Sequence, residues 1–354
     1  MGKPRLSREA LELLRASVAQ AKEPLYLVGG ALRDLLLERP TSDLDLATTE
    51  AAALARRLAK ALGGAFVELD GTNAIYRVAF KPESGREIAQ LDLAGLQGKT
   101  IEEDLARRDF TINAMALRLD DKLAAAIEPG KLLDPRGGAA DLKKGVLRCE
   151  SEQLFADDPL RLLRAFRLSA QLGLEIEPET LAMVKRLRHR IRKPAGERVH
   201  TELVLMLGAP GCARRLAQMD EAGLLTALIE ELEPARQCAE EYYGPGGVMK
   251  HSLAVAARAD LLLSRLALLV PDTARKIEEQ LAAEGPVARA TIVLAALLHD
   301  VAKPDTAKTV GGRLRFFGHD TVGAQRARPL LERLRAPRAQ IDRICAVIAA
   351  HLRP

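Results

Sequence analysis

The stretches LYLVGGALRD (residues 25–34) and TSDLDLATT (residues 41–49) decide how the first part of the chain folds. The first opens with a short apolar run that ends at two glycines, which predicts a buried strand turning into a helix. In the second, polar and apolar residues alternate, as they do on a strand with one polar and one apolar face. We therefore expect strands at 25–28 and 41–49, with a helix at 31–37 between them.

Asp43 and Asp45 are the chemically informative residues of the second strand. Because they lie two residues apart, their carboxylates project from the same face, separated by roughly 6.6 Å of backbone rise. That spacing suits a pair of Mg²⁺ ions, which can activate an attacking hydroxyl and stabilise a leaving pyrophosphate. Asp92, in a predicted strand at 87–93, is the candidate third carboxylate. A lone D-x-D pair is more often a solvated strand face, so the surrounding residues must decide.

The two glycines before the helix supply the second half of a candidate nucleotide site. Gly29 and Gly30 let the backbone approach a triphosphate closely, with the helix N-terminus aimed at negative charge. Arg33 would then reach the phosphates one turn into the helix, next to Asp34. A Gly-Gly turn followed by an Arg-Asp pair is more often structural when taken singly. With a D-x-D strand nine residues beyond Asp34, it becomes a specific arrangement.

The remainder of the chain changes from mixed to helical patterns. A helix at 50–62 and strands at 65–69 and 74–80 complete the α+β part, and a looser segment with turns at 129–130 and 134–138 follows. Beyond it, helical spacing recurs at 157–173, 178–189, 197–208, 211–219, 221–230, 250–267, 273–283, 288–299, 320–334 and 338–352. The expected domains are 1–120, 121–150, 151–240 and 241–354. Because the chain stops directly after a predicted helix, our hypothesis is that the last domain continues in a longer parent protein.

Composition narrows the class of protein. Of the 354 residues, 48% are hydrophobic but only 3% aromatic, which favours helices packed by aliphatic side chains. The net charge of +5 is compatible with a polyanionic partner, although many basic proteins bind no nucleic acid. The four cysteines lie far apart, so neither a zinc ribbon nor a disulfide framework is indicated. Residues 1–23 read as an amphipathic helix rather than a signal peptide, so we expect a cytoplasmic protein with no membrane association.

Several strings, taken in order, resemble one family. GGALRD at 29–34 followed by DLD at 43–45 resembles the signature of the polymerase β-like nucleotidyltransferase superfamily. RRDFTINAMA at 107–116 resembles the ribose-recognition motif of bacterial tRNA nucleotidyltransferases and poly(A) polymerases. DDPLRLLRAFR at 157–167 resembles their base-selecting motif, and ERVHTEL at 197–203 resembles their neck-helix motif. The resemblance covers residues 25 to about 205, and it implies an α+β fold: a small mixed or antiparallel-sheet nucleotidyltransferase head followed by an all-α neck, body and HD-type helical domain.

The ribose and base motifs allow a physical interpretation beside the family one. Asp109 and Asn113, four apart on a predicted helix, share a face that could hold a ribose 2′-hydroxyl, and Asp109 could equally cap the helix. Asp158 and Arg161, three apart, form an intrahelical ion pair by default. The resemblance implies instead that they hydrogen-bond the Watson–Crick edge of the incoming base. The expected nucleotide-binding residues are Gly29, Gly30, Arg33, Asp34, Arg108, Asp109, Asn113, Asp158, Arg161 and Arg164.

Two further positions of the base-selecting motif bear on specificity. Asp157 stands where the motif usually begins with Glu, and the shorter side chain could change how the templating pair is held. That departure concerns whether C, C and A are added in turn or only part of the set. Arg164 is expected to support the base site or contact triphosphate, and Arg167 to face a partner carboxylate or RNA.

Four histidines in the last third of the chain form a second constellation. An isolated histidine is more often a satisfied core or surface residue than a ligand. Their order, with an acidic residue directly after the second, resembles the HD-domain phosphohydrolases, and imidazole with carboxylate suits a divalent transition metal. A secondary phosphohydrolase activity is therefore possible. The candidate ligands are His251, His299, Asp300, His319 and His351.

The leading hypothesis is a tRNA nucleotidyltransferase in which the tRNA 3′-hydroxyl attacks the α-phosphate of CTP or ATP while Asp43 and Asp45 hold Mg²⁺. The acceptor arm and 3′ end of tRNA would be held by shape and phosphate contacts. An A-adding or CC-adding partial enzyme and a poly(A) polymerase are the alternatives within the superfamily. The alternative from another class is an HD-domain metal-dependent phosphohydrolase with a regulatory head. A mere RNA-binding scaffold would not need paired carboxylates beside a phosphate loop.

Overall fold

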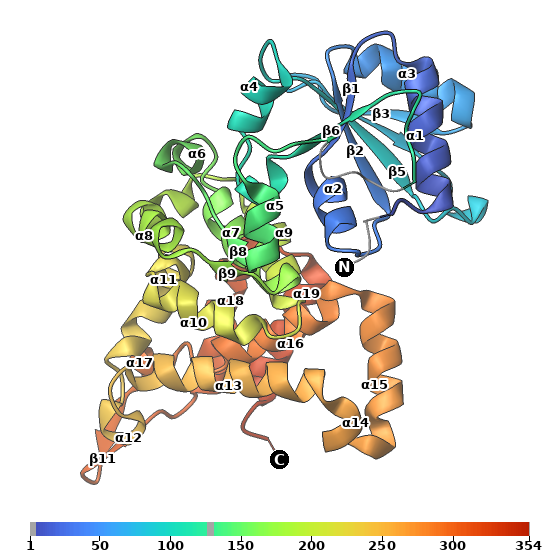
Figure 1. Ribbon diagram of the computed structural model, residues 1–354. Helices are drawn as coiled ribbons and strands as arrows, with labels where there is room; N and C mark the ends of the chain where they lie inside the picture. Colours follow the sequence, from blue (N-terminus) through green and yellow to red (C-terminus); the bar gives the residue numbers. More distant parts are fainter. Residues whose placement is uncertain (1–4, 126–130, 354) are drawn as a thin grey trace. The chain divides into compact units, whose positions relative to one another are not determined.

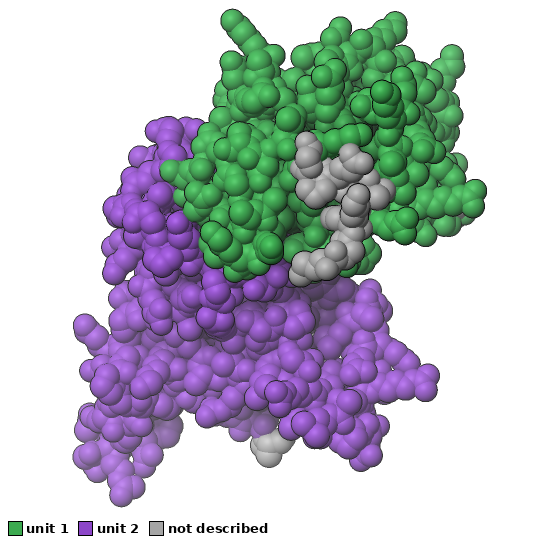
Figure 2. Space-filling model, viewed as in Figure 1, with its two compact units in different colours: residues 1–150 green, residues 151–354 purple. Residues whose placement is uncertain are grey.

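The computed structural model describes residues 5–125 and 131–353, which fall into two compact units, residues 1–150 and 151–354 (Figures 1 and 2). The turn predicted at Pro129–Gly130 lies outside the described residues. The expected boundary between residues 240 and 241 lies inside the second unit, at the start of helix α12 (Glu240–Tyr243).

The first unit is built on a seven-stranded sheet in the order β3-β4-β5-β2-β1-β6-β7. Strands β2 and β5 pair in parallel and the other neighbours are antiparallel, so the predicted mixed-sheet head is confirmed. The strands are β1 Leu25–Val28, β2 Asp43–Thr48, β3 Ala65–Asp70, β4 Ile75–Ala79, β5 Gln90–Gly95, β6 Ala116–Leu119, β7 Leu132–Leu133 and the short β8 Val146–Leu147. The helices are α1 Arg8–Gln20, α2 Gly29–Leu36, α3 Ala51–Leu62, α4 Ile101–Ala106 and α5 Gly138–Lys144.

The central strands of this sheet have one apolar and one polar face. Leu44 and Leu46 of β2 are about 1% exposed, and α3 packs on the neighbouring strands β4 and β5 with its own Leu54 and Leu58 fully buried. Burying a leucine fully contributes roughly 1.5–3 kcal/mol, so this apolar face fixes which way β2 is turned. The aspartates that alternate with the leucines are thereby directed to the opposite face of the sheet.

Two expectations for the first unit need correction. Helix α2 begins at Gly29 rather than at Ala31, so both glycines belong to its first turn. The segment 121–150, expected to hold only turns and short extended pieces, also contains helix α5. Its first N–H groups are capped by Asp134, whose carboxylate accepts from Gly138 at 2.7 Å and from Ala139 at 3.0 Å.

The second unit is helical, as predicted. Its helices are α6 Glu152–Asp157, α7 Arg161–Leu172, α8 Pro178–Leu187, α9 Gly196–Leu207, α10 Cys212–Glu221, α11 Leu224–Leu228, α12 Glu240–Tyr243, α13 Gly247–Ser264, α14 Leu266–Leu269, α15 Pro271–Glu284, α16 Pro286–Leu298, α17 Lys303–Thr306, α18 His319–Arg333 and α19 Arg338–Ala350. Helix α16 packs against α9, α13 and α19, and its Val293, Leu294 and Leu298 are buried. This central helix ends where the histidines gather.

Two details of the second unit differ from expectation. The helix predicted at 157–173 is split: α6 ends at Asp157, Asp158 is extended, and α7 begins at Arg161. Pro159 explains the break, because a residue before proline is excluded from helical geometry. Strands β10 (Lys308–Val310) and β11 (Arg313–Arg315) form a hairpin that was not predicted, closed by Gly311 and Gly312, both with positive φ. Strand β9 spans only Glu175–Ile176.

Within the described residues, membrane-spanning length and hydropathy are reached by no individual helix. Only a sharply bent pair, Pro271–Glu284 with Pro286–Thr306, meets the criterion when its two parts are combined.

Candidate active site and metal centre

Three carboxylates lie on the polar face of the central strands. Asp43 and Asp45 occupy the same face of β2, and the parallel pairing places Asp92 of β5 beside Asp45. Arg77 of β4 pairs with Asp92 across the antiparallel ladder and holds its carboxylate with two hydrogen bonds of 2.7 and 2.8 Å. Arg77 was absent from the predicted set, because nothing local in the sequence shows that β4 lies against β5.

The environment of the two β2 aspartates opposes negative charge. Burial raises the pKa of Asp45, and the neighbouring charges of Asp92 and Asp43 raise it further, whereas the hydrogen bond from the Ala31 N–H opposes them. That N–H lies 3.1 Å from Oδ2 of Asp45. Burial likewise raises the pKa of Asp43. Carboxylate oxygens crowded in this way are the ligands that Mg²⁺ takes, and a cation would relieve their repulsion, so the residues fit a divalent ion.

Gly29 and Gly30 lie directly against this carboxylate. Gly29 has φ +66°, and a Cβ there would lie 3.2 Å from Nη1 of Arg108 and 3.3 Å from Oδ2 of Asp45. A Cβ on Gly30 would lie 3.5 Å from the same carboxylate oxygen. The first turn of α2 therefore approaches Asp45 as closely as a backbone without side chains allows, with its N–H groups at the carboxylate.

Arg33, Asn113 and Asp109 form a hydrogen-bonded chain. Nη1 of Arg33 donates to Oδ1 of Asn113 at 2.8 Å, and Nδ2 of Asn113 donates to Oδ1 of Asp109 at 3.0 Å. Arg33 also forms a two-bond ion pair with Asp34 at 2.9 Å. The helix expected across 109–113 is wrong, since the region has only a single 3-10 turn at Thr111–Asn113. The two polar groups nevertheless meet, and Asp109 is buried.

Arg108 is held by a residue that sequence reasoning missed. Its Nε and Nη2 atoms lie 3.0 and 2.9 Å from Oδ2 of the buried Asp104. The spacing of four residues could have indicated this pair. Asp104 thus directs the guanidinium of Arg108 toward Gly29 and Asp45.

The predicted base-selecting residues are described within the second unit alone. Oδ2 of Asp158 accepts from Nη2 of Arg198 at 2.9 Å, and no ion pair between Asp158 and Arg161 is formed. Nη1 of Arg161 donates to the backbone carbonyl of Leu154 at 3.1 Å. The intrahelical ion pair is therefore not present, because Pro159 separates the two residues into different elements.

Arg164 and Arg167 share one carboxylate of the neighbouring helix. Nε of Arg164 lies 3.0 Å from Oε1 of Glu202, and Nε of Arg167 lies 2.6 Å from Oε2. Glu202 is 7% exposed and belongs to α9, within the motif at 197–203. The expectation that Arg167 faces a partner carboxylate agrees with this contact.

Four histidines from four different helices converge on Asp300. Nε2 of His251 and of His299 lie 3.4 and 3.0 Å from its Oδ2. Nε2 of His319 and of His351 lie 3.2 and 3.7 Å from its Oδ1. The five candidate ligands predicted from the sequence are therefore brought together. Their donor atoms form two groups, each within 4.8 Å, that share Asp300, and no comparably tight group occurs elsewhere among residues 5–125 and 131–353.

The protonation of these rings favours a cation between them. Nδ1 of His299, His319 and His351 each lies 2.6–2.8 Å from the backbone carbonyl three residues earlier, which places the proton on Nδ1 and leaves Nε2 a lone pair. The Nε2 atoms of His319 and His351 then face each other at 3.2 Å. Both oxygens of Asp300 are buried without a well-aligned hydrogen bond. Such orphaned acceptors fit a divalent metal ion.

Lys303 is a member of this cluster that sequence reasoning did not include. Its Nζ lies 2.6 Å from Oδ2 of Asp300 and 2.7 Å from the Tyr243 hydroxyl. Although burial favours the neutral acid, the imidazoles of His299 and His319 hold the pKa of Asp300 well below its usual range. The signal was available, since Lys303 follows Asp300 by one helical turn.

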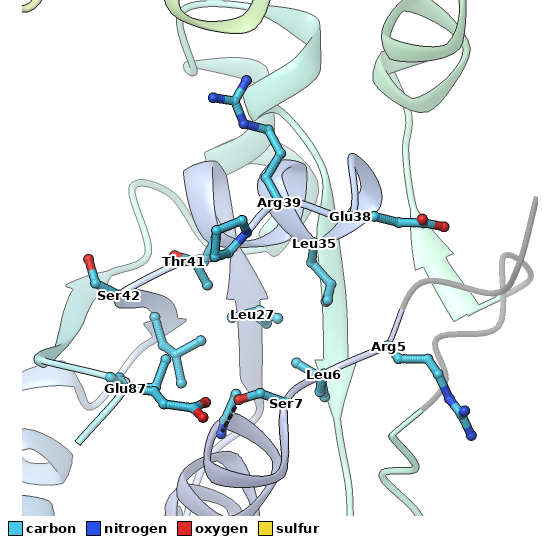
Figure 3. Close-up of a pocket in the computed structure, with 15 residues that line it drawn as sticks. Arg5, Leu6, Ser7, Leu27, Leu35, Glu38, Arg39, Thr41, Ser42 and Glu87 are labelled. Carbon is cyan, nitrogen blue, oxygen red and sulfur yellow. Dashed lines mark hydrogen bonds between the residues drawn. The ribbon is translucent and has the colours of Figure 1, made fainter. Parts of the chain in front are cut away.

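A pocket of about 920 Å³ in the first unit is separate from the carboxylates (Figure 3). Leu27 and Leu44 line it, and both belong to the apolar face of their strands. Asp43 and Asp45 alternate with Leu44 and so face away from this pocket. The pocket is therefore no part of the candidate active site.

The glycine turn against paired carboxylates on a mixed sheet, followed by a helical unit with a histidine cluster, defines the chain as a nucleotidyltransferase of the poly(A) polymerase type with an appended HD domain. The family descriptions that match say the same: the poly A polymerase head domain matches residues 25–148, the probable RNA and SrmB-binding site of polymerase A matches 173–236, and the HD domain matches 248–354. Nucleotidyltransferases and HD domains of these families typically depend on divalent metals.

The chain belongs to the tRNA nucleotidyltransferase family, as its sequence motifs predicted. It is 36% identical over 333 residues to the A-adding tRNA nucleotidyltransferase of Deinococcus radiodurans, covering 92% of this chain and 68% of that protein. It is 32% identical to the CC-adding enzyme of Thermus thermophilus, covering 92% and 68%. With the CC-adding enzyme of Geobacter sulfurreducens it shares 42% over 205 residues, 58% of this chain and 45% of that protein, so there it spans less than half of its relative.

Solved structures confirm the fold. A tRNA-processing enzyme in its apo form matches with a TM-score of 0.70 at 22% identity, over 98% of this chain and 79% of that one. A CCA-adding enzyme solved with CTP matches with a TM-score of 0.65 at 24% identity, over 98% and 71%. A tRNA nucleotidyltransferase solved with a primer tRNA and an ATP analogue matches with a TM-score of 0.65 at 22% identity, over 94% and 83%.

Proposed function

We propose that the chain transfers CMP, AMP or both from CTP and ATP to the 3′ end of tRNA without a nucleic-acid template. The single observation that carries the proposal is the contact between the first turn of α2 and Asp45 on the polar face of β2. The relatives named as A-adding, CC-adding and CCA-adding tRNA nucleotidyltransferases support the choice of acceptor and of nucleotides.

In the proposed reaction the 3′-hydroxyl oxygen attacks the α-phosphorus, a new P–O bond forms, and pyrophosphate leaves. Asp43 and Asp45 would hold Mg²⁺, which supplies charge neutralisation and lowers the pKa of a bound hydroxyl. Asp92 lies beside them with Arg77, so it can orient an acceptor oxygen or complete the ion's ligands. The N–H groups of α2 and the guanidinium of Arg33 face the same side and suit the triphosphate.

The remaining nucleotide-binding roles follow from the hydrogen-bonded groups. Asp109 and Asn113, already joined, offer acceptor and donor atoms to a ribose 2′-hydroxyl, which favours ribonucleotides. Asp158 and Arg161 carry the edge groups needed to select cytosine or adenine, with Arg198 placing the Asp158 carboxylate. Arg164 would support that site from its ion pair with Glu202.

The test incubates the full chain and Mg²⁺ with tRNAs that lack all three terminal nucleotides, lack only the last, or lack none, with CTP and ATP supplied separately. Extension stopping at a complete end supports tRNA repair, and the nucleotide used at each step distinguishes CC, A and CCA addition. Long adenylate tails would favour a poly(A) polymerase instead. If no acceptor is extended with either nucleotide, the proposal is wrong.

A matched pair of variants ties the activity to the site. Asp45→Asn should lower the transfer rate at least about a hundredfold, because a metal ligand contributes several kcal/mol to such a transition state. Asp70→Asn changes a carboxylate on strand β3 that has no part in the site and should transfer at the parent rate. Equal activity of both variants would contradict the assigned role of Asp45.

A second activity is favoured by one observation, the convergence of four histidines on Asp300. We propose that this cluster holds a divalent transition metal and hydrolyses phosphoesters, with water as the nucleophile and an alcohol as the leaving group. Metal content after dialysis against Mn²⁺ or Ni²⁺ checks this, since His299→Ala should lose the bound metal. Retention of full metal content by His299→Ala would place the metal elsewhere.

A further inference from the structure

A second pocket opens beside the histidine cluster of the second unit. Its volume is about 660 Å³, within the range of small-molecule sites. It is lined by Tyr242, Lys303, Arg313, Leu314, Arg315, Phe316, Phe317, Gly318, His319 and Leu352. Two of these, Lys303 and His319, also contact Asp300, so the pocket and the cluster share a wall.

The pocket carries positive charge only. Arg313 and Arg315 lie on strand β11 of the hairpin, and no carboxylate within the described residues approaches either guanidinium to within 4.0 Å. No acidic residue lines the pocket, whereas Lys303 adds a third cation. Unpaired arginines beside a metal-binding cluster suit the oxygens of a phosphate group.

Two exposed aromatic rings stand at the same pocket. Phe317 is 72% exposed and Tyr242 is 53% exposed, in a chain that has only seven phenylalanines and four tyrosines. The Tyr242 hydroxyl accepts from the Leu314 N–H at 3.1 Å, which ties α12 to strand β11 (Figure 1). Exposed rings beside arginines form the platforms on which bases stack. A site for inorganic phosphate alone would not need them.

We propose that this pocket binds a nucleoside monophosphate group, with its phosphate toward Lys303, His319 and the hairpin arginines and its base on Phe317 or Tyr242. The group can be a free nucleotide or the phosphorylated end of an RNA strand. The proposal deepens the metal cluster proposed above and rests on it, whereas nucleotidyl transfer by the first unit is independent of it.

The binding experiment uses the full chain loaded with Mn²⁺ and isothermal titration calorimetry. The probes are adenosine 3′-monophosphate, ribose 5-phosphate, inorganic phosphate and a short oligoribonucleotide ending in a 3′-phosphate. Adenosine 3′-monophosphate should bind at least about fivefold more tightly than ribose 5-phosphate, because only the nucleotide can stack. Comparing it with the oligoribonucleotide distinguishes a free nucleotide from an RNA end.

Three variants locate the binding. Phe317→Ala should weaken the nucleotide roughly five- to hundredfold and leave ribose 5-phosphate unchanged. Arg313→Ala combined with Arg315→Ala should weaken both probes. Val310→Ala is the matched control, since Val310 is 53% exposed on the same hairpin but does not line the pocket. Nucleotide binding by the first unit is common to all variants and cancels in the comparison.

The outcomes separate the two proposals. If Mn²⁺ binds but adenosine 3′-monophosphate binds no better than ribose 5-phosphate, or Phe317→Ala behaves as Val310→Ala does, the nucleotide pocket is overturned while the metal cluster stands. If wild type takes up no more Mn²⁺ than His299→Ala, both the cluster and the shared site are overturned. In either case tRNA extension by the first unit is unaffected.

Discussion

Asp45 is a residue whose chemistry works against the stability of the fold. The pKa of Asp45 is raised in the folded protein by burial and by Asp92 and Asp43, so the unfolded chain ionises at a lower pH than the folded one. The resulting destabilisation is absent below the ordinary value of 3.8 and complete above the raised pKa. A cation bound at neutral pH would remove it.

Asp45→Asn is therefore expected to stabilise the metal-free protein at pH 7.5 while abolishing transfer. A rise of about 2–4 °C in Tm would correspond to roughly 1 kcal/mol for a unit of this size. The amide oxygen can still accept the Ala31 N–H. Thermal unfolding at several pH values checks this, because the difference should shrink as the pH falls toward 4.

Two comparisons accompany that measurement. Asp70→Asn should bring no gain, since the hydrogen bonds from Asn73 hold the pKa of Asp70 below its usual value. Adding Mg²⁺ should raise the Tm of wild type but not of Asp45→Asn. A variant less stable than wild type at pH 7.5 would contradict the role of burial at this position.

Sequence reasoning reached the three carboxylates because period-two alternation fixes which residues share a strand face. Asp43 and Asp45 needed only that rule, and Asp92 needed the further guess that its strand lies alongside. Arg77 could not be reached in this way, because the pairing of β4 with β5 is a long-range property of the sheet. Asp104 lay one helical turn before Arg108 and was reachable.

At the scale of elements, the first turn of α2 is shaped by Gly29. An L-residue at φ +66° costs roughly 1–2 kcal/mol, and here its Cβ would also press on Arg108 and Asp45. Gly29→Ala should therefore lower both stability and the transfer rate. Gly63→Ala is the matched control, because Gly63 has φ +69° and no atom within 4 Å of the added Cβ.

The two glycine variants are expected to lose similar stability in urea unfolding. Only Gly29→Ala should lose transfer, by at least about tenfold, since the crowding falls on groups assigned to the metal and triphosphate. Equal activity in both variants would show that the close approach of α2 has no catalytic importance.

Helices α7 and α9 are joined through Glu202. Removing a buried carboxylate that holds two arginines leaves their charges uncompensated, so Glu202→Ala should destabilise the protein by about 3 kcal/mol. Glu175→Ala is the comparison, because Glu175 also contacts two arginines, Arg214 and Arg215, but its side chain is 48% exposed. That loss should stay below about 1 kcal/mol. Equal losses in denaturant titrations would refute the distinction by burial.

Element boundaries were predictable where a local rule applied and lost where two rules competed. The break before α7 was overlooked because the apolar spacing of 157–173 was given more importance than Pro159, which decides the geometry of Asp158. The β10–β11 hairpin was missed because its strands are only three residues long and lie among helices. Its Gly311–Gly312 turn was the available signal.

Across the whole molecule, the two constellations belong to different units of the chain. Asp43, Asp45 and Asp92 lie in residues 1–150, whereas the histidines and Asp300 lie in residues 151–354. The order of the histidines predicted a shared site, but their orientation came only from the structure. Each Nδ1 is held by a carbonyl of its own helix end or turn, and four helices must pack before the rings face one another.

Separate chemistry predicts separable losses. His299→Ala should abolish transition-metal uptake by the second unit yet retain tRNA extension within about twofold, because none of the atoms assigned to transfer contacts the cluster. Asp45→Asn should do the reverse, with no extension and unchanged Mn²⁺ content. Metal analysis and tRNA extension on the same preparations check both. If His299→Ala also lost extension while remaining folded, the cluster would have to act on the transfer reaction, and the assignment of one activity to each unit would fail.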